Sequence, residues 1–311
     1  MSNKYTIYNN DLKFKENRNI DFDDVDLTKN NISNKINIDH DTIEYRYQEC
    51  IEHKYFSLDL TSLNLNLIPK LSNNFLNIKC LFLANNKLTG ILDITYFKNL
   101  ISIDIDNNQI TNLILPESIE EVSCQHNLIQ TISDHNKLKR LKISYNKFKQ
   151  ISNFPNLEIL EATNNNIYSL NEYKKLKRLI IYSNPITKII LNNNLIYADL
   201  SETLIDDLNK CDTVEQLVLN NCIKLNKLQS MENIKSLELM GTKLNKLNFY
   251  KNFEIIIFNI NLIQNISSKY KDYNSNFQIR NKTMLCISRG QTIYDNTPTG
   301  LLGSIPTGLL G

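Results

Sequence analysis

Apolar residues recur in one register between residues 55 and 268. Each segment aligns to the pattern L-x-x-L-x-L-x-x-N-x-L-x-x-L, whose fourth position serves here as an anchor. Eleven segments fit, and successive anchors are 23, 22, six times 19, then 20 and 19 residues apart. The anchors are Leu58, Leu81, Ile103, Val122, Leu141, Leu160, Leu179, Ala198, Leu217, Leu237 and Ile256. Such a register predicts an array of structural repeats.

Each anchor is predicted to lie in a short β-strand. The anchor and the residue two positions later are apolar, and this period of two places both side chains on one face of a strand. About five residues follow the pattern before the next repeat, too few for a regular helix. We therefore expect extended segments or single 3₁₀ turns on the return side, with room for a short helical turn in the intervals of 23 and 22 residues. No repeat can bury its apolar residues alone, so stability must come from stacking on neighbours.

The position five residues after the anchor is the most specific signal. Seven of its eleven residues are Asn, whereas the overall Asn content, 48 of 311, would place one or two there by chance. The column starts with Leu63 and continues with Asn86, Asn108, Asn127, Asn146, Asn165, Asn184, Thr203, Cys222, Thr242 and Asn261. We predict a ladder of side chains that satisfies buried backbone groups after each strand. Asn165→Ala should then cost about 1–3 kcal/mol, and Asn164→Ala beside it should cost little.

These residues resemble the leucine-rich-repeat family over about two thirds of the chain. The resemblance implies an α/β, β-dominated solenoid: a right-handed superhelix with a concave parallel sheet of about 11 strands, used to hold other macromolecules. The composition and the 19-residue period also resemble repeat proteins of A/T-rich amoebal hosts and their large DNA viruses.

The remaining segments are assigned by composition. Residues 1–54 are expected to form an N-terminal cap, with a degenerate repeat near residues 22–32 and an amphipathic helix over 41–56; a polar tail is the alternative. Residues 55–268 are expected to form the solenoid, and residues 269–288 are expected to form a C-terminal cap. Residues 289–311, which contain Pro-Thr-Gly-Leu-Leu-Gly twice, are expected to be a low-complexity, flexible tail.

The charge and the cysteine content argue against several classes of function and location. Lys+Arg 35 against Asp+Glu 33 leaves a net charge of +2, which provides no field to attract nucleic acid or a membrane. No apolar run approaches the roughly 20 residues of a membrane span, and no signal peptide is evident. The six Cys are scattered, which favours reduced thiols in an intracellular, cytoplasmic setting.

No constellation for catalysis is apparent, so we expect no enzyme, cofactor, metal site or small-molecule substrate. Cys124 and His126 would be the nucleophile–base pair, but Cys124 occupies an inward apolar column. Asp104 and Asp106 could bind a hard cation, but a solvated acidic patch is the favoured interpretation because no third carboxylate is adjacent.

The outward strand positions are the candidate binding surface. They combine charges of both signs with tyrosines, as protein-binding surfaces do; the alternative is an ordinary solvated sheet face. The residues are Asp104, Asp106, Glu121, Arg140, Lys142, Tyr145, Glu161, Arg178, Tyr182, Tyr197 and Asp199. We therefore predict a non-enzymatic scaffold that binds a protein partner through this sheet. The alternative is the recognition subunit of an enzyme complex, such as a ubiquitin-ligase adaptor, docking through residues 1–54.

Overall fold

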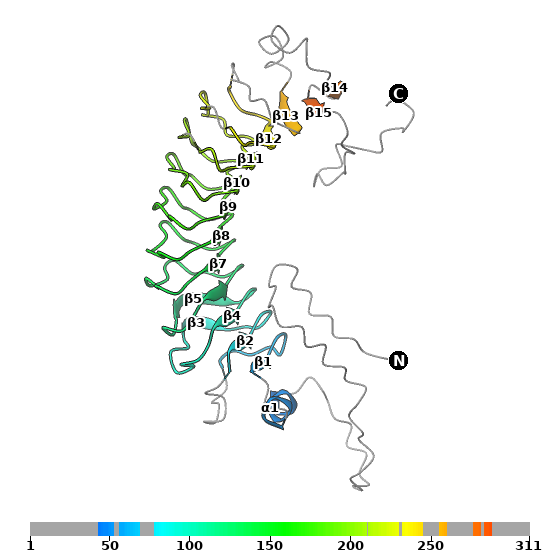
Figure 1. Cartoon of the computed structure of the whole chain (residues 1–311). Coiled ribbons are helices and arrows are strands. Elements are labelled where there is room, and N and C mark those ends of the chain that lie inside the picture. Colours follow the sequence, from blue (N-terminus) through cyan, green and yellow to red (C-terminus); the bar gives the residue numbers. More distant parts are fainter. Residues whose placement is uncertain are drawn as a thin grey trace. The chain divides into compact units, whose positions relative to one another are not determined.

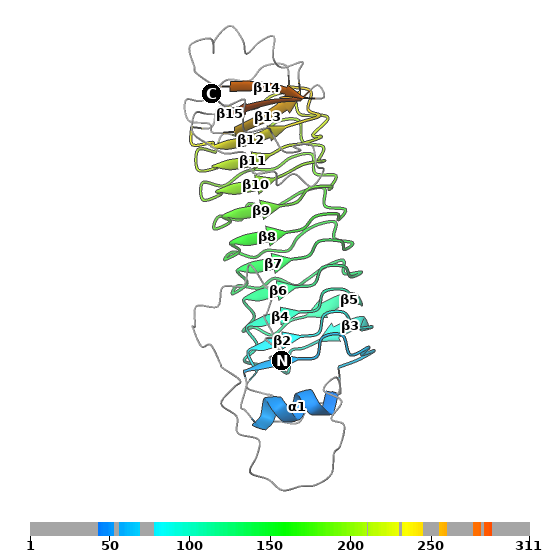
Figure 2. The same cartoon turned by 90° about the vertical axis from the view of Figure 1, so that its right-hand side faces the viewer.

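The computed structural model contains one long sheet with a short strand from each repeat (Figures 1 and 2). It describes residues 43–52, 56–68, 78–209, 211–229, 232–244, 255–259, 276–280 and 283–287, the last three as backbone. Contacts divide the chain into Met1–Asp39 and His40–Gly311, and every element below belongs to the second unit. The expected degenerate repeat, Asn261 and the tail 289–311 lie outside the described residues.

The main sheet has 13 strands, of which the first eleven run parallel. These are β1 (Ser57–Asp59), β2 (Cys80–Phe82), β4 (Ser102–Asp104), β6 (Glu121–Ser123), β7 (Arg140–Lys142), β8 (Ile159–Glu161), β9 (Arg178–Ile180), β10 (Tyr197–Asp199), β11 (Gln216–Val218), β12 (Ser236–Leu239) and β13 (Ile255–Asn259). Every anchor pairs with the anchor of the next strand; Leu141, for example, faces Leu160, which faces Leu179. The predicted parallel solenoid is confirmed, and its repeats are numbered one to eleven below.

The core is a continuous apolar stack inside the repeats. The anchors of repeats one to ten are at most 2% exposed, and the residues two positions later, such as Leu83 and Ile143, are fully buried. Burying one such side chain contributes roughly 1.5–3 kcal/mol before conformational entropy is subtracted. Because each apolar layer is completed by the neighbouring repeat, the strands are held in one register.

In repeats one to ten the main-sheet strand is followed by a residue in the left-handed region, four positions after the anchor. In repeats one to nine φ lies between 52° and 61°, and Gly241 in repeat ten has a φ of 72°. The residues are Ser62, Asn85, Asn107, His126, Tyr145, Asn164, Ser183, Glu202, Asn221 and Gly241. This conformation reverses the chain sharply, and it costs least for Gly and Asn.

The return side of the solenoid is mostly extended. Short turns close with a bond from an N–H to the carbonyl three residues earlier, as in Leu157 to Phe154 and Leu176 to Tyr173. In repeats two and three a second sheet forms from β3 (Thr89–Asp93) and β5 (Gln109–Ile114), which pair in parallel. The extra residues of the 22-residue interval follow β3 and form two short turns, in which Phe97 N–H donates to the carbonyl of Ile94 and Leu100 N–H to that of Phe97. The corresponding part of the first interval lies outside the described residues.

The two ends of the sheet differ. At the first end, α1 (Ile43–Glu52) lies within the range predicted to be helical. Its residues Ile43, Tyr47, Cys50 and Ile51 pack against the core, as the amphipathic pattern predicts. At the other end, β13 pairs antiparallel with β15 (Thr283–Ile287), which pairs antiparallel with β14 (Asn276–Arg280). α1, the helix in the described part of the chain, is too short and polar to cross a membrane.

Candidate functional site

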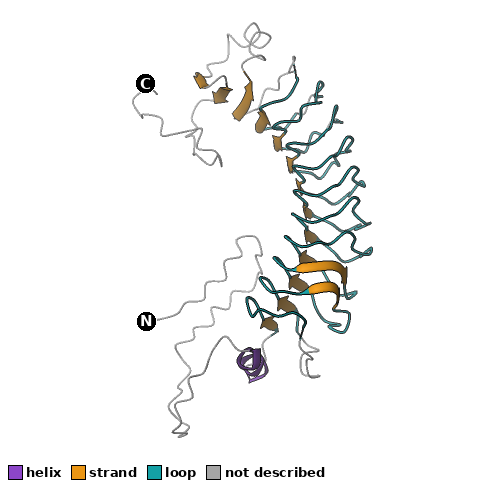
Figure 3. Cartoon of the chain, turned by 180° about the vertical axis from the view of Figure 1, so that it is seen from behind, coloured by secondary structure: helices purple, strands orange, loops and turns teal. Residues whose placement is uncertain are grey.

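The face of the main sheet turned away from the core is the candidate interaction surface. We call it the concave face because the strands line the inner side of the curved stack of repeats (Figures 1 and 3). Its residues stand one before, one after, three after and four after each anchor. All eleven predicted surface residues lie at these positions; Tyr145 is 44% exposed, and the others are half-buried.

Basic side chains in the middle of the face are ion-paired. Arg140 Nε lies 3.4 Å from Glu121 Oε1, and Lys142 Nζ lies 3.7 Å from Glu161 Oε2. Arg178 Nε is 4.0 Å from the other oxygen of Glu161, and its guanidinium lies over the ring of Tyr197, 4.3 Å from the ring centroid. Ion pairs this exposed contribute about 0–1 kcal/mol each to folding stability. Their main effect is to neutralise the positive charges of the face.

Asp104 and Asp106 are half-buried and hydrogen-bonded, so the predicted solvated patch is only partly correct. The amide N of Asp106 donates to Asp104 Oδ1 at 3.0 Å. Asp106 accepts bonds from Ser123 Oγ and from both the backbone and side chain of Gln125. Burial raises the pKa of Asp104 to about 6, and the charge of Asp106 adds to the shift. Burial also raises the pKa of Asp106, against the effect of its hydrogen bonds.

An aromatic pair projects from the carboxyl-terminal side of the strands. The rings of His126 and Tyr145 are stacked, with centroids 4.3 Å apart and planes at 10°. Both residues occupy the left-handed position, with φ of 53° and 58°. Burial raises the pKa of the nearby Tyr182, and the hydrogen-bonded hydroxyl of Tyr145 adds to the shift. The three side chains form an aromatic cluster over repeats four to seven.

On the inner side of the same strands, the Asn side chains join successive repeats. Asn165 Nδ2 lies 2.9 Å from the carbonyl O of Ile143 in the preceding repeat and 3.1 Å from that of Ala162 in its own. Its Oδ1 accepts a bond from the N–H of Phe148 at 3.0 Å. The equivalent bonds are made by Asn86, Asn108, Asn127, Asn146 and Asn184. Each amide thus satisfies an otherwise buried N–H and two buried carbonyls.

Smaller groups take this position in repeats eight to ten. Thr203 Oγ1 donates to the carbonyl of Leu200 in its own repeat at 2.7 Å, and Cys222 Sγ donates to the same carbonyl at 3.1 Å. Thr242 Oγ1 donates to the carbonyl of Leu239. These groups make fewer bonds between repeats than Asn does, so the last three members of the described ladder are less cross-linked.

Comparison with known proteins gives structural matches. No protein-family model and no curated protein matches the chain. A chain of the LRIM1/APL1C complex matches with a TM-score of 0.53 and 20% identity, covering 72% of this chain and 49% of that chain. At 20% identity the similarity concerns the fold. The APL1 leucine-rich repeat domain matches at 0.46 and 18% identity, covering 77% and 67%. YopM from Yersinia enterocolitica WA-314 matches at 0.43 and 18% identity, covering 68% and 67%.

The fold is a leucine-rich-repeat solenoid. It carries the repeat pattern, stacks the repeats in register and matches a chain of the LRIM1/APL1C complex in fold. The narrower resemblance to repeat proteins of amoebal hosts and their viruses is not supported by these matches.

Within the leucine-rich-repeat solenoid, the candidate catalytic residues are separated. Cys124 is fully buried, and burial raises the pKa of its thiol well above the ordinary value. His126 is exposed and stacks on Tyr145, on the other side of the strand. In the part of the chain that the structure describes, no three His, Cys, Asp or Glu side chains are grouped to hold a metal ion.

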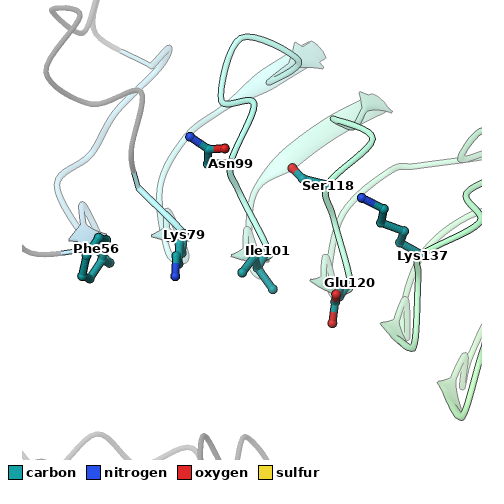
Figure 4. Close-up of a pocket in the computed structure, with 7 residues that line it drawn as sticks. All are labelled: Phe56, Lys79, Asn99, Ile101, Ser118, Glu120 and Lys137. Atoms are coloured by element: carbon teal, nitrogen blue, oxygen red, sulfur yellow. The ribbon is translucent and has the colours of Figure 1, made fainter. Parts of the chain in front are cut away.

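A shallow pocket lies beside the concave face, at the amino-terminal ends of the strands of repeats one to four (Figure 4). It encloses about 370 Å³ and is lined by Phe56, Lys79, Asn99, Ile101, Ser118, Glu120 and Lys137. Glu120 is bound by Lys139 at 2.7 Å, and Ser118 Oγ donates to the carbonyl of Leu100 at 2.6 Å. Since its carboxylate and hydroxyl are both engaged, the pocket offers no nucleophile–base pair.

Two features of the leucine-rich repeats were not predicted. The left-handed position was missed because its residue types vary, although Asn pairs such as Asn85-Asn86 carry a signal. On the return side, a second set of amides bridges repeats: Asn171 Nδ2 binds the carbonyl of Ile151 at 3.1 Å, and Asn192 Nδ2 that of Tyr173 at 2.9 Å. These asparagines are not in one sequence column, so no periodic signal revealed them.

Proposed function

We propose that this leucine-rich-repeat protein is a non-enzymatic scaffold that binds a protein partner through its concave face. The observation that carries the proposal is the composition of that face: aromatic rings and an Arg–Tyr stack lie among charged groups across the central repeats. Tyr and Arg are enriched among the residues that dominate protein–protein binding energies.

The rigidity of the support adds to the argument. Each presenting strand is hydrogen-bonded in register to two neighbours, and the Asn ladder holds the residues that follow each strand. Side chains on such a support lose little further backbone freedom when a partner binds, which favours affinity. We extend the proposal to an intracellular setting on the sequence grounds of the scattered cysteines.

The alternative hypothesis is that residues 1–54 dock an enzyme complex, and the contacts of α1 at the first end of the solenoid are relevant to it. The apolar side of α1 packs on the core, Cys50 Sγ donates to the carbonyl of Ser57, and Arg46 Nη1 donates to that of Asp59. These bonds cover carbonyls on the outer edge of β1. We therefore assign α1 to an N-terminal cap, which supports binding through the sheet over docking through this helix.

Other classes of ligand receive less support. The separation of Cys124 from His126 gives no basis for an enzyme activity. The concave face carries more carboxylates than basic groups, which disfavours nucleic acid and anionic membranes. The shallow lining of the pocket beside β1 and β2 does not resemble the enclosed, largely apolar sites of small molecules.

Affinity capture from the native cell tests the proposal. Arg178→Ala with Tyr182→Ala removes two side chains of the face and is expected to abolish recovery of proteins captured by the wild-type chain, at an unchanged melting temperature. Tyr168→Ala with Lys188→Ala, at exposed positions outside the face, is the matched control and should retain them. Equal recovery by all three proteins would reject this surface.

A further inference from the structure

The concave face of repeats three to eight is acidic, although the whole chain has a net charge of +2. Its strand and turn positions carry six carboxylates and three basic side chains. The carboxylates are Asp104, Asp106, Glu121, Glu161, Asp199 and Glu202; the basic residues are Arg140, Lys142 and Arg178. Each basic group is already ion-paired with Glu121 or Glu161. The remaining charge is therefore negative, from Asp104 and Asp106 in repeat three and from Asp199 and Glu202 in repeat eight.

The aromatic cluster lies between these two acidic groups. His126 and Tyr145 belong to repeats four and five and Tyr182 to repeat seven. The carboxylate of Asp106 is close enough to His126 to interact electrostatically with it. His126 and Tyr145 are stacked and exposed, so the faces of the stack that do not contact each other are available to a flat cationic group.

The same face already contains one contact of this kind. Arg178 lies over Tyr197 at 4.3 Å within repeats seven and eight. A guanidinium is planar and weakly hydrated, so it stacks on aromatic rings more readily than an ammonium does. An arginine from a partner would find a comparable ring at Tyr145, with carboxylates on both sides of the cluster.

We propose that the partner presents a basic segment that contains arginine; this inference rests on the function proposed above. The guanidinium groups of the segment stack on His126 and Tyr145. Its net positive charge is matched by the carboxylates of Asp104, Asp106, Asp199 and Glu202. The stacking selects arginine over lysine, and the carboxylates select a basic segment over an acidic one. The face is a poor match for nucleic acid because its unpaired groups would repel phosphates.

The test uses the full chain and short fluorescent peptides of alternating Gly with Arg, Lys or Glu. Fluorescence anisotropy is expected to show binding of the Arg peptide, weaker binding of the Lys peptide and none of the Glu peptide. Tyr145→Asn should reduce affinity for the Arg peptide by about threefold to tenfold, as expected for loss of a cation–π contact, and bring it near that of the Lys peptide. Asn already occupies the equivalent position in Asn107 and Asn164, so this variant keeps the backbone conformation.

A control variant and four outcomes decide whether the proposed partner chemistry is wrong. Tyr168→Asn, which removes an exposed ring outside the face, should leave Arg-peptide binding unchanged. The proposal is overturned if the Arg peptide does not bind, if the Lys peptide binds equally well, if Tyr145→Asn binds like the wild type, or if a labelled oligonucleotide binds more tightly than the Arg peptide. Loss of captured partners in Arg178→Ala with Tyr182→Ala, without Arg-peptide binding to the wild type, would retain the protein-binding function and reject only this partner chemistry.

Discussion

Asn165 Oδ1 accepts a hydrogen bond from the backbone N–H of Phe148, 3.0 Å away on the preceding repeat. The same amide donates to the carbonyls of Ile143 and Ala162. One side chain therefore satisfies backbone groups of two repeats that no strand pairing reaches. This relation explains why the asparagine position is so regular in repeats two to seven.

We expect Asn165→Ala to lower the free energy of unfolding by about 1–3 kcal/mol, because it leaves these buried groups without partners. Urea denaturation followed by circular dichroism measures the change. Asn166→Ala, at an exposed neighbouring position, is the control and should stay within about 0.5 kcal/mol of the wild type. Similar midpoints for the two variants would contradict the ladder.

Asn164 is a poor control for that experiment, and the expectation from the sequence requires revision. Its φ of 52° places it in the left-handed region, where a residue with a Cβ costs roughly 1 kcal/mol and Asn is better tolerated than Ala. We expect Asn164→Ala to destabilise the protein measurably and Asn164→Gly to match or exceed the wild type. Thermal melts of both variants test whether a Cβ is strained at this position. An Ala variant as stable as the Gly variant would exclude such strain.

The raised pKa of Asp104 predicts how folding stability changes with pH. Its folded pKa of about 6 lies above its ordinary value of 3.8, so the ionised group destabilises the fold above pH 6, and this cost disappears as the pH falls toward 4. Asp104→Asn should therefore raise stability at pH 7.5 by about 1–3 kcal/mol, at about 1.4 kcal/mol per pKa unit. Its advantage should vanish near pH 4.

Denaturation at several pH values measures this difference. Asp206→Asn, at an exposed position outside the face, should follow the wild type at every pH. An Asp104→Asn advantage that is independent of pH would show that packing, and not ionisation, is responsible.

His135 should have the opposite pH dependence. The side chain is only 5% exposed, and burial lowers its pKa below the ordinary value of 6.5. The unfolded chain therefore takes up a proton first, and stability is lost as the pH falls below about 6.5. The wild type should lose more stability than His135→Gln between neutral pH and pH 5, as measured by denaturation at several pH values. Parallel curves for His135→Gln and the wild type would exclude this role.

The strand register was predictable because apolar residues occupy the same positions of the pattern in all eleven repeats. The insertion that moves Leu225 and Leu228 one place later changes the interval after Leu217 to 20 residues, and β11 and β12 still pair Leu217 with Leu237. Stacking requires apolar residues to coincide, so periodicity alone fixes which residues face each other. The small sheet of β3 and β5 was not predictable, since it occurs in two repeats and leaves no period.

The charge of the concave face was predictable only in part. The sequence places Arg140 and Glu121 on one surface, which suggests a mixture of both signs. The pairing across strands, which neutralises Arg140, Lys142 and Arg178, depends on side-chain geometry that sequence columns do not contain. The stack of His126 on Tyr145 depends in the same way on geometry, because both residues have a positive φ, which is uncommon outside Gly.

The position of α1 against β1 has a consequence for assembly. A stack of parallel strands could in principle continue from one molecule into the next, producing head-to-tail filaments. Here α1 covers carbonyls on the outer edge of β1, so this edge is not free to pair with the last strand of another molecule. Head-to-tail growth through β1 is therefore blocked, so the number of stacked strands is encoded in the polypeptide and should not grow with protein concentration.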